Sequence, residues 1–269
     1  MRHLLILVIL CFASFAGSFR LAAEEHGKGR AIMRETLLAY YYSGSDAQAR
    51  ISLRLLDHEG HTRTRRLTML RLDQEDGGKQ FYYIYFYEPP DVRGMSFLVS
   101  KHPGRDDDRW LYLPSIDLVK RIATSDKRTS FAGSDFTYED VSGRDLDEDE
   151  HELLGEEALG EYSTFVVKST PKRSREVEFS VRKFWIDKTT RLPLKVEHYD
   201  LRGALYKIYE TREIRTIQDF PTITKAVMKN LGSGHETEIT IEAISYDAGL
   251  TPDLFQERFL RRPPTKWIR

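Results

Sequence analysis

The feature that most constrains this chain is a two-residue period in its hydrophobic residues, which returns in one segment after another between positions 49 and 246. Ile51, Leu53 and Leu55 alternate with polar residues, and Ile239 and Ile241 do the same far along the chain. Such alternation is typical of β-strands with one buried and one solvated face. Turn sequences containing Gly or Asp separate the segments, so neighbouring strands are expected to pair antiparallel. The strand candidates cover residues 49–55, 63–72, 81–87, 96–99, 109–113, 162–168, 176–186, 194–201, 204–214, 222–230 and 235–246.

A mainly β (α+β) fold follows, with roughly ten strands in an antiparallel sheet that curls into a barrel or half-barrel. One early helix is expected over residues 30–42, where Met33, Leu37, Tyr40 and Tyr41 share an apolar face. Residues 81–87 are apolar or aromatic throughout, as in a strand that is covered on both faces.

Two local patterns refine this expectation. The alternation near the end of the last strand shifts at Ile244 and Tyr246, which indicates a β-bulge or bend. The acidic run at residues 145–152 is expected to be a solvated loop. No change of composition marks a domain boundary, so residues 24–269 are expected to form a single domain.

The N-terminus resembles a targeting segment, with Arg2 followed by an apolar run from Leu4 to Ala16. The run is shorter than the ~20 residues that span a bilayer. We expect residues 1–23 to be a signal peptide, cleaved after Ala16 or Ala23, and the mature protein to be exported in soluble form. An uncleaved membrane anchor is the alternative. The sole cysteine, Cys11, lies in this segment, and the large Leu10 before it argues against lipid attachment.

Charge and motifs narrow the function. The formal net charge is −1, which provides no positive field for a dedicated nucleic-acid binder. His58 and His61 are expected to be exposed turn histidines, because no further ligands for a metal are evident nearby. The consecutive Asp106, Asp107 and Asp108 lack the alternate spacing of a calcium loop. We therefore expect no catalytic residue, no metal and no cofactor.

A hydrolase remains an open alternative. Asp135, Glu139 and Asp140 could serve as acid and base carboxylates, although glycoside hydrolysis needs two carboxylates at a defined separation across a cleft. Aromatic strands such as residues 81–87 would suit sugar stacking.

The stronger signal is apolar. A curled sheet has a concave face, and a helix that fills it incompletely leaves an apolar cavity suited to an acyl chain. Burying such a chain contributes about 0.8 kcal/mol per CH₂. The open alternative is that the same residues simply pack the core. Taken from alternate strand positions and from one helix face, the cavity candidates are Met33, Leu37, Tyr41, Leu53, Leu55, Met69, Tyr83, Tyr85, Phe97, Trp110, Tyr112, Phe165 and Phe179.

Three short segments carry a family resemblance: Trp110–Pro114, Lys120–Ile122 and Gly133–Asp140, the last reading GSDFTYED. Together they resemble a signature of outer-membrane lipoprotein-sorting proteins of the LolA/LolB-like superfamily, in the branch often found beside RND-type exporters. The resemblance covers most of the chain, from about residue 30 to residue 246.

The resemblance implies an incomplete antiparallel β-barrel with helices plugging its concave face. It implies a periplasmic carrier rather than an enzyme, one that shields the acyl chains of a lipoprotein or of a free lipid such as a hopanoid or phospholipid. An inner-membrane RND-type transporter and an outer-membrane acceptor are the expected partners of a monomeric protein. A periplasmic accessory or scaffold protein of such an exporter, without lipid cargo, is the alternative.

Overall fold

The computed structural model describes residues 24–268, so the expected signal peptide and Cys11 lie outside the described residues. The strands are β1 (Asp46–Leu56), β2 (Thr62–Asp73), β3 (Gln80–Glu88), β4 (Ser96–Lys101), β5 (Asp108–Leu113), β6 (Leu118–Arg121), β7 (Asp149–Leu159), β8 (Tyr162–Pro171), β9 (Phe179–Asp187), β10 (Pro193–Asp200), β11 (Leu205–Ile217), β12 (Phe220–Asn230) and β13 (His235–Tyr246). Helical elements are an N-terminal helix over residues 24–41, α2 (Tyr138–Ser142), α3 (Arg258–Arg261) and five 3₁₀ turns, η1 (Pro114–Ile116), η2 (Thr124–Asp126), η3 (Leu146–Glu148), η4 (Ser174–Glu176) and η5 (Pro252–Leu254).

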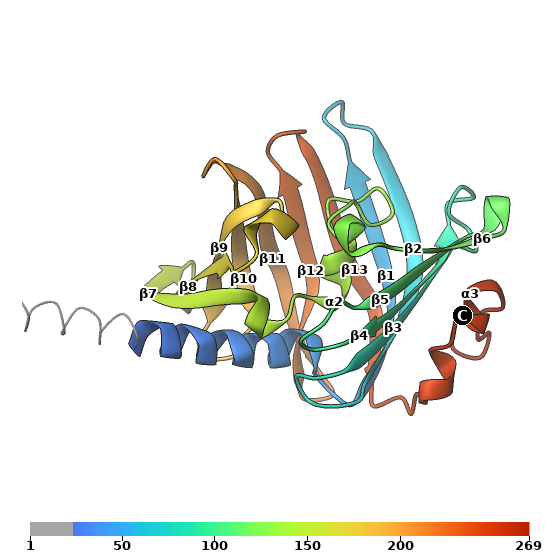
Figure 1. Ribbon diagram of the computed structural model, residues 1–269, viewed down its shortest axis with the longest axis horizontal. Helices are drawn as coiled ribbons and strands as arrows, with labels where there is room; N and C mark the ends of the chain where they lie inside the picture. Colours follow the sequence, from blue (N-terminus) through green and yellow to red (C-terminus); the bar gives the residue numbers. More distant parts are fainter. Residues whose placement is uncertain (1–23, 269) are drawn as a thin grey trace, which may run out of the picture.

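Within the described residues, all thirteen strands form one antiparallel sheet in the order β6-β5-β4-β3-β2-β1-β13-β12-β11-β10-β9-β8-β7. Strands β6 and β7 are its two edges and do not pair, so the sheet curls without closing (Figure 1). The predicted incomplete barrel is therefore confirmed. Because β6 and β7 are consecutive in sequence yet lie at opposite edges, residues 122–148 must cross between them. We call these residues the crossing segment.

The N-terminal helix lies along the concave side, near the lower ends of the strands in Figure 1. It packs so closely against β7 that a Cβ atom at Gly29 would lie 2.7 Å from the backbone nitrogen of Leu153. Only glycine permits this approach. The helix and the crossing segment together provide the predicted plug.

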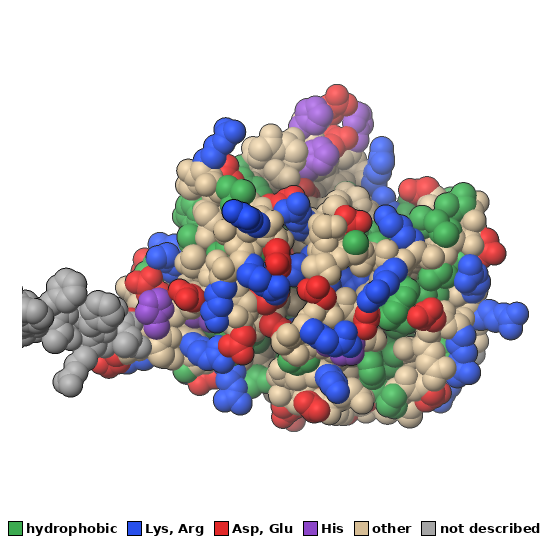
Figure 2. Space-filling view, in the orientation of Figure 1, with side chains coloured by type: hydrophobic (Ala, Val, Ile, Leu, Met, Phe, Trp, Pro, Cys, Tyr) green, Lys and Arg blue, Asp and Glu red, His purple; other side chains and the backbone are tan. Residues whose placement is uncertain are grey.

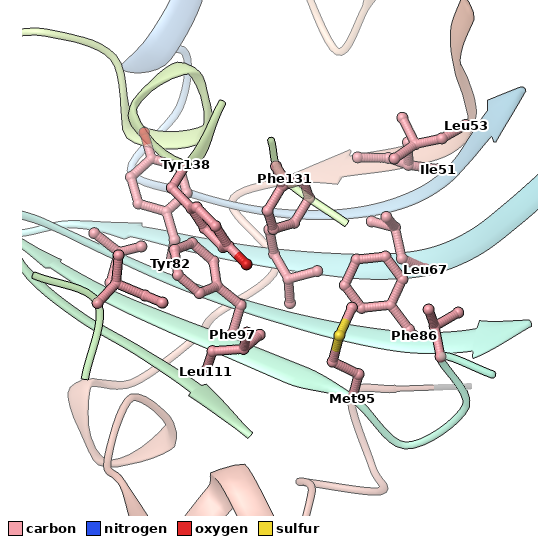
Figure 3. Packing of buried hydrophobic residues seen from close by; sticks show 14 of the residues in the cluster. Ile51, Leu53, Leu67, Tyr82, Phe86, Met95, Phe97, Leu111, Phe131 and Tyr138 are labelled. Atoms are coloured by element: carbon pink, nitrogen blue, oxygen red, sulfur yellow. The ribbon is translucent and has the colours of Figure 1, made fainter. Parts of the chain in front are cut away.

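Two apolar clusters fill the concave side. The first joins β1–β5 to the crossing segment, where the ring centroid of Phe131 lies 5.7 Å from that of Phe86 and 5.5 Å from that of Phe97 (Figure 3). The second joins β8–β12 to Ile32 and Met33 of the N-terminal helix. Each half of the sheet is thus covered by a different plugging element.

The convex side of β2–β5 is covered by the C-terminal segment, residues 247–268, which contributes Leu254, Phe255 and Leu260 to a third cluster. The hydroxyl of Tyr83 donates to the carbonyl of Phe259 at 2.8 Å. Ser96 donates to the carbonyl of Leu260 at 2.8 Å. The apolar strand β3 is consequently covered on both faces, as its sequence predicts.

Replacing Tyr83 with phenylalanine is expected to lower the free energy of unfolding by about 1–2 kcal/mol, because the buried Phe259 carbonyl would lose its donor. Urea denaturation measures the loss, and limited proteolysis should show faster cleavage within residues 247–268. Tyr162→Phe is the matched control, since Tyr162 is 38% exposed. Equal stabilities for the two variants would contradict this anchoring role.

Two sequence expectations are wrong. The acidic run at residues 145–152 is not a solvated loop: it forms η3 and the start of β7, with Asp149 and His151 buried. The reason is that arginines pair with Asp149, which removes the cost of burying its charge. Neither β6 nor β7 was among the strand candidates, so the described sheet has more strands than the roughly ten predicted.

The bulge prediction is confirmed. Arg50 pairs with Ala243 while the next residue, Ile51, pairs with Ile241, so Glu242 is the extra residue in β13. The shift returns both Ile241 and Ile244 to the concave face, where both line the same cavity.

Candidate functional site

The concave side holds a cavity of about 190 Å³, which we call the main cavity. Its walls come from β1–β3 and β11–β13, with the N-terminal helix and the crossing segment on the open side. Apolar lining residues include Ala49, Ile51, Leu53, Leu67, Met69, Ile84, Phe131, Phe136, Ile223, Ala226, Ile239, Ile241 and Ile244. Apolar cavities of ~150 Å³ stay dry and accept benzene-sized guests, so this one suits hydrocarbon rather than water.

Most polar groups in the wall are bound to protein partners, and the buried Nε of Arg71 is an exception. Arg71 donates from Nη1 to the carbonyl of Tyr41 at 2.6 Å and from Nη2 to the carbonyl of Ser43 at 2.5 Å. The Tyr246 hydroxyl lies 2.8 Å from that of Thr222. Burial raises the pKa of Tyr41 and of Tyr209 well above the usual value of a phenol, which keeps both neutral. The wall therefore carries little net polarity toward its interior.

A second cavity, of about 100 Å³, lies between the N-terminal helix, the crossing segment and strands β7 and β9–β12. Both cavities are lined by Tyr40, Tyr41, Phe136, Asp140 and Tyr209, so one layer of side chains divides them. In this layer the hydroxyl oxygens of Tyr40 and Tyr209 are 3.4 Å apart. In the same layer the Tyr41 hydroxyl donates to the carbonyl of Asp140 at 3.3 Å.

The signature segment Gly133–Asp140 shapes this division. Gly133 adopts φ 76°, and Ser134 donates to the carbonyl of Phe131 at 2.7 Å, which closes a tight bend. The Asp135 carboxylate accepts from the Thr237 hydroxyl at 2.7 Å. Thr137 and Asp140 form a capping box at the start of α2. In this segment, the polar residues hold the bend and the start of α2 in place. Phe136 lines both cavities.

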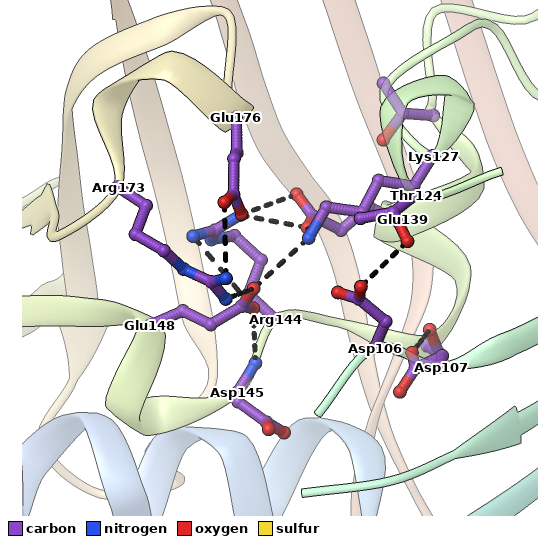
Figure 4. A network of polar contacts seen from close by, with 12 residues as sticks. Asp106, Asp107, Thr124, Lys127, Glu139, Arg144, Asp145, Glu148, Arg173 and Glu176 are labelled. Atoms are coloured by element: carbon purple, nitrogen blue, oxygen red, sulfur yellow. Dashed lines mark hydrogen bonds and ion pairs between the residues drawn. The ribbon is translucent and has the colours of Figure 1, made fainter. Parts of the chain in front are cut away.

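A buried ionic network anchors the crossing segment to the β7 side of the sheet (Figure 4). Arg144 donates to both carboxylate oxygens of Glu139, at 2.9 and 3.0 Å, and to Asp149 at 3.0 Å. Lys127 lies 2.8 Å from Glu139 and 3.1 Å from Glu148. Burial alone would raise the pKa of Glu139, but Arg144 and Lys127 outweigh it and hold that pKa below the usual value. Glu139 is therefore ionised and does not suit the general acid of a hydrolase.

The structure distributes the predicted cavity residues over several places. Tyr41, Leu53 and Met69 line the main cavity, and Met33 and Leu37 line the second. The others on the concave side pack beside these spaces without lining either. They are Leu55 and Phe97 in the first cluster, Phe165 in the second and Phe179 against the Arg182 guanidinium.

Four predicted cavity residues lie on the opposite face. Tyr83, Tyr85, Trp110 and Tyr112 pack in the convex cluster beneath the C-terminal segment. Placing them in the cavity is wrong, because side chains alternate along a strand and Tyr82, Ile84 and Leu111 occupy the concave positions. In a strand that is apolar on both faces, composition does not reveal which parity faces inward.

Sequence reasoning also missed residues that line the main cavity. Ala49 and Ile51 have the parity of Leu53 and were within reach of the same argument. Phe136 and Ala226 carried no such signal, since one lies in an irregular segment and the other is small.

The remaining candidates lie away from the cavities. His58 and His61 are exposed at the β1–β2 turn, where histidines gather at the top of Figure 2. Residues 24–268 contain no group of His, Cys, Asp and Glu side chains that could hold a metal. Asp107 pairs with Arg109 at 2.6 Å, and Asp106 accepts from Thr124. In the described part of the chain, no helix is long and apolar enough to cross a bilayer.

An open, curled antiparallel sheet with a helix along its concave side is an incomplete β-barrel. A family model described as "Uncharacterized protein" matches residues 78–262, more than half of the chain, so the chain belongs to the family that this model describes. None of the curated proteins matches significantly.

Several solved structures are similar to this chain. A Vibrio parahaemolyticus domain described as an outer-membrane lipoprotein-sorting protein is 29% identical, with a TM-score of 0.82 over 88% of this chain and 100% of that one. A DUF1329 family protein from Desulfovibrio piger is 28% identical, with a TM-score of 0.81 over 88% and 99%. A LolA superfamily protein from Nitrosomonas europaea, 18% identical with a TM-score of 0.67 over 86% and 98%, shares the fold.

Proposed function

We propose that this protein is a periplasmic carrier that holds the acyl chains of a lipoprotein or a free lipid in the main cavity and moves them toward the outer membrane. The observation that carries the proposal is the apolar main cavity, lined by the sheet and its plug. The relative described as lipoprotein-sorting supports it. Residues 24–269 would act as one monomeric carrier domain, between an inner-membrane RND-type transporter and an outer-membrane acceptor.

The energetics suit a carrier. Each buried methylene contributes about 0.8 kcal/mol, so a few methylenes in the main cavity hold a chain reversibly. No covalent bond is needed, and release requires only that the plug move away.

The experiment is extraction of lipids from freshly purified protein, followed by mass spectrometry, for the wild-type chain and for Ala226→Phe. Ala226 is 1% exposed and lines the main cavity, so a phenyl ring there occupies the space of the cargo. We expect the wild-type protein to carry lipid and the variant to carry at least about tenfold less, since overpacking by 1–3 kcal/mol opposes insertion.

Ala158→Phe is the matched control, because Ala158 is exposed on the edge strand β7. It should retain wild-type lipid. Wild-type protein without lipid, or equal lipid in both variants, would count against a carrier that uses the main cavity. Thermal melting of Ala226→Phe verifies that the variant is folded.

A further inference from the structure

Three basic side chains occupy adjacent positions on β9, β10 and β11. His198 lies directly opposite Arg182 on one side and Lys207 on the other. Cross-strand partners project to the same face of a sheet. Arg182 and His198 both line the second cavity, so this face is the concave one.

The guanidinium of Arg182 is held in place by its neighbours, and one of its N–H donors has no acceptor. Its guanidinium carbon lies 4.8 Å from the ring centroid of Phe179 and 5.2 Å from that of Phe184. Nη2 donates to Asp149 at 2.7 Å. Its buried Nε has no hydrogen-bond partner among the described residues. A buried guanidinium donor without an acceptor is costly, so an acceptor from a ligand would be favoured.

The imidazole of His198 is the second potential hydrogen-bond donor at this wall. It is 8% exposed, and its ring meets Phe179 and Tyr206 edge-on, at centroid distances of 6.2 and 6.3 Å. Burial first, and then the cations of Arg182 and Lys207, keep its pKa well below the usual value. A neutral imidazole retains one N–H donor. Lys207 adds positive charge nearby and donates to the carbonyl oxygen of Asp135 at 2.8 Å.

The carboxylates that face the second cavity are already engaged. Asp149 accepts from Arg144 and Arg182, with its oxygens 3.0 and 2.7 Å from their nitrogens. Asp140 accepts from the backbone and hydroxyl of Thr137. Asp145 accepts from the backbone of Gly104. The Nε–H of Arg182 lies outside these pairings, so the group that complements it is a hydrogen-bond acceptor such as an oxyanion.

We propose that the second cavity binds the oxyanion head of an anionic lipid, a carboxylate or a phosphate, through Arg182 and His198. The acyl tail would pass Phe136 into the main cavity, because that side chain lies in the single layer between the two spaces. This inference rests on the proposed function and specifies its cargo as an acidic lipid with at least one acyl chain.

The test compares three ligands with the same chain: hexadecanoate, hexadecyl phosphate and hexadecan-1-ol. Dissociation constants are measured on delipidated full-length protein by displacement of a fluorescent fatty acid. We expect at least one of the anions to bind the wild-type protein about tenfold tighter than the alcohol, as hydrogen bonds to a charged group imply. The tighter of the two anions identifies the head group.

The variants are His198→Phe and Arg182→Met. Each should weaken binding of the preferred anion about tenfold and leave the alcohol unchanged. His198→Phe keeps the ring shape and leaves the Arg182–Asp149 pair intact, so it remains informative if Arg182→Met fails to fold. Lys168→Met, at a side chain that is 39% exposed and pairs with Glu152, is the control and should bind like the wild type.

Two results would overturn the proposal. One is equal affinity of the wild-type protein for the alcohol and both anions. The other is an anion preference that persists in both variants. Failure of all three ligands to bind would overturn the proposed function as well, whereas binding of the alcohol alone would leave the carrier function standing and remove only the head-group site.

Discussion

Replacing Arg144 with methionine is expected to lower the free energy of unfolding by about 3 kcal/mol, because breaking a buried ion pair leaves an uncompensated charge behind. Arg144 is 8% exposed and bridges Glu139 of α2 to Asp149 of β7. Lys127 and Arg182 still contact these carboxylates, which places the loss at the lower end of the range for such pairs. Urea denaturation of the two proteins measures it.

Arg215→Met is the control. Arg215 pairs with Glu213 on the surface, where its side chain is 64% exposed, so its removal should change stability by less than about 1 kcal/mol. A similar small loss for Arg144→Met would mean that the network does not hold the crossing segment to the sheet.

The same network predicts a pH dependence. The pKa of Glu139 and that of Asp149 are lowered by their arginine and lysine partners, against the effect of burial. A lowered pKa in the folded state contributes stability above the unfolded pKa, and this stability is lost as the pH falls through the folded pKa. Unfolded carboxyls titrate near pH 4, so wild-type stability should fall steadily below about that pH. In Arg144→Met the fall should be shallower.

Phe131→Ala is expected to cost about 3–4 kcal/mol, since it removes a buried ring from the first cluster. Phe131 is 5% exposed and contacts Phe86, Phe97 and Tyr138. It is the apolar counterpart of the ionic anchor, because it attaches the crossing segment to the β3–β4 side of the sheet. Thermal and urea unfolding measure the effect.

A double-mutant cycle makes this prediction specific. Phe131→Ala combined with Phe97→Ala should show a coupling energy of about 0.5–3 kcal/mol, as expected for residues in contact. Phe131→Ala combined with Phe255→Ala should be additive within about 0.5 kcal/mol, because Phe255 packs on the convex face. Equal coupling energies in both pairs would contradict the placement of Phe131 and Phe255 on opposite faces of the sheet.

Particular residues show which features of the fold could be predicted from the sequence. Alternation through Ile51 and Leu53, and its shift at Ile244, predicted an antiparallel sheet with a bulge, because a two-residue period has one structural cause. Tyr83 was wrongly predicted to face the cavity, because a strand that is apolar at every position gives no indication of which face is concave. Asp149 was wrongly predicted to lie in a solvated loop. Its charge is buried because Arg144 and Arg182 lie beside it, and the sequence does not show that pairing.

By itself the sequence determined the fold class, the bulge and the resemblance to lipoprotein-sorting proteins, because these depend on local periodicity and on a contiguous signature. Only the tertiary structure decided which face of each strand lines the cavities, and that Phe136 divides them. It also decided that Arg182 and His198 meet at one wall. These properties arise from pairing between distant segments, so strand register and the path of the crossing segment, rather than any local pattern, create them.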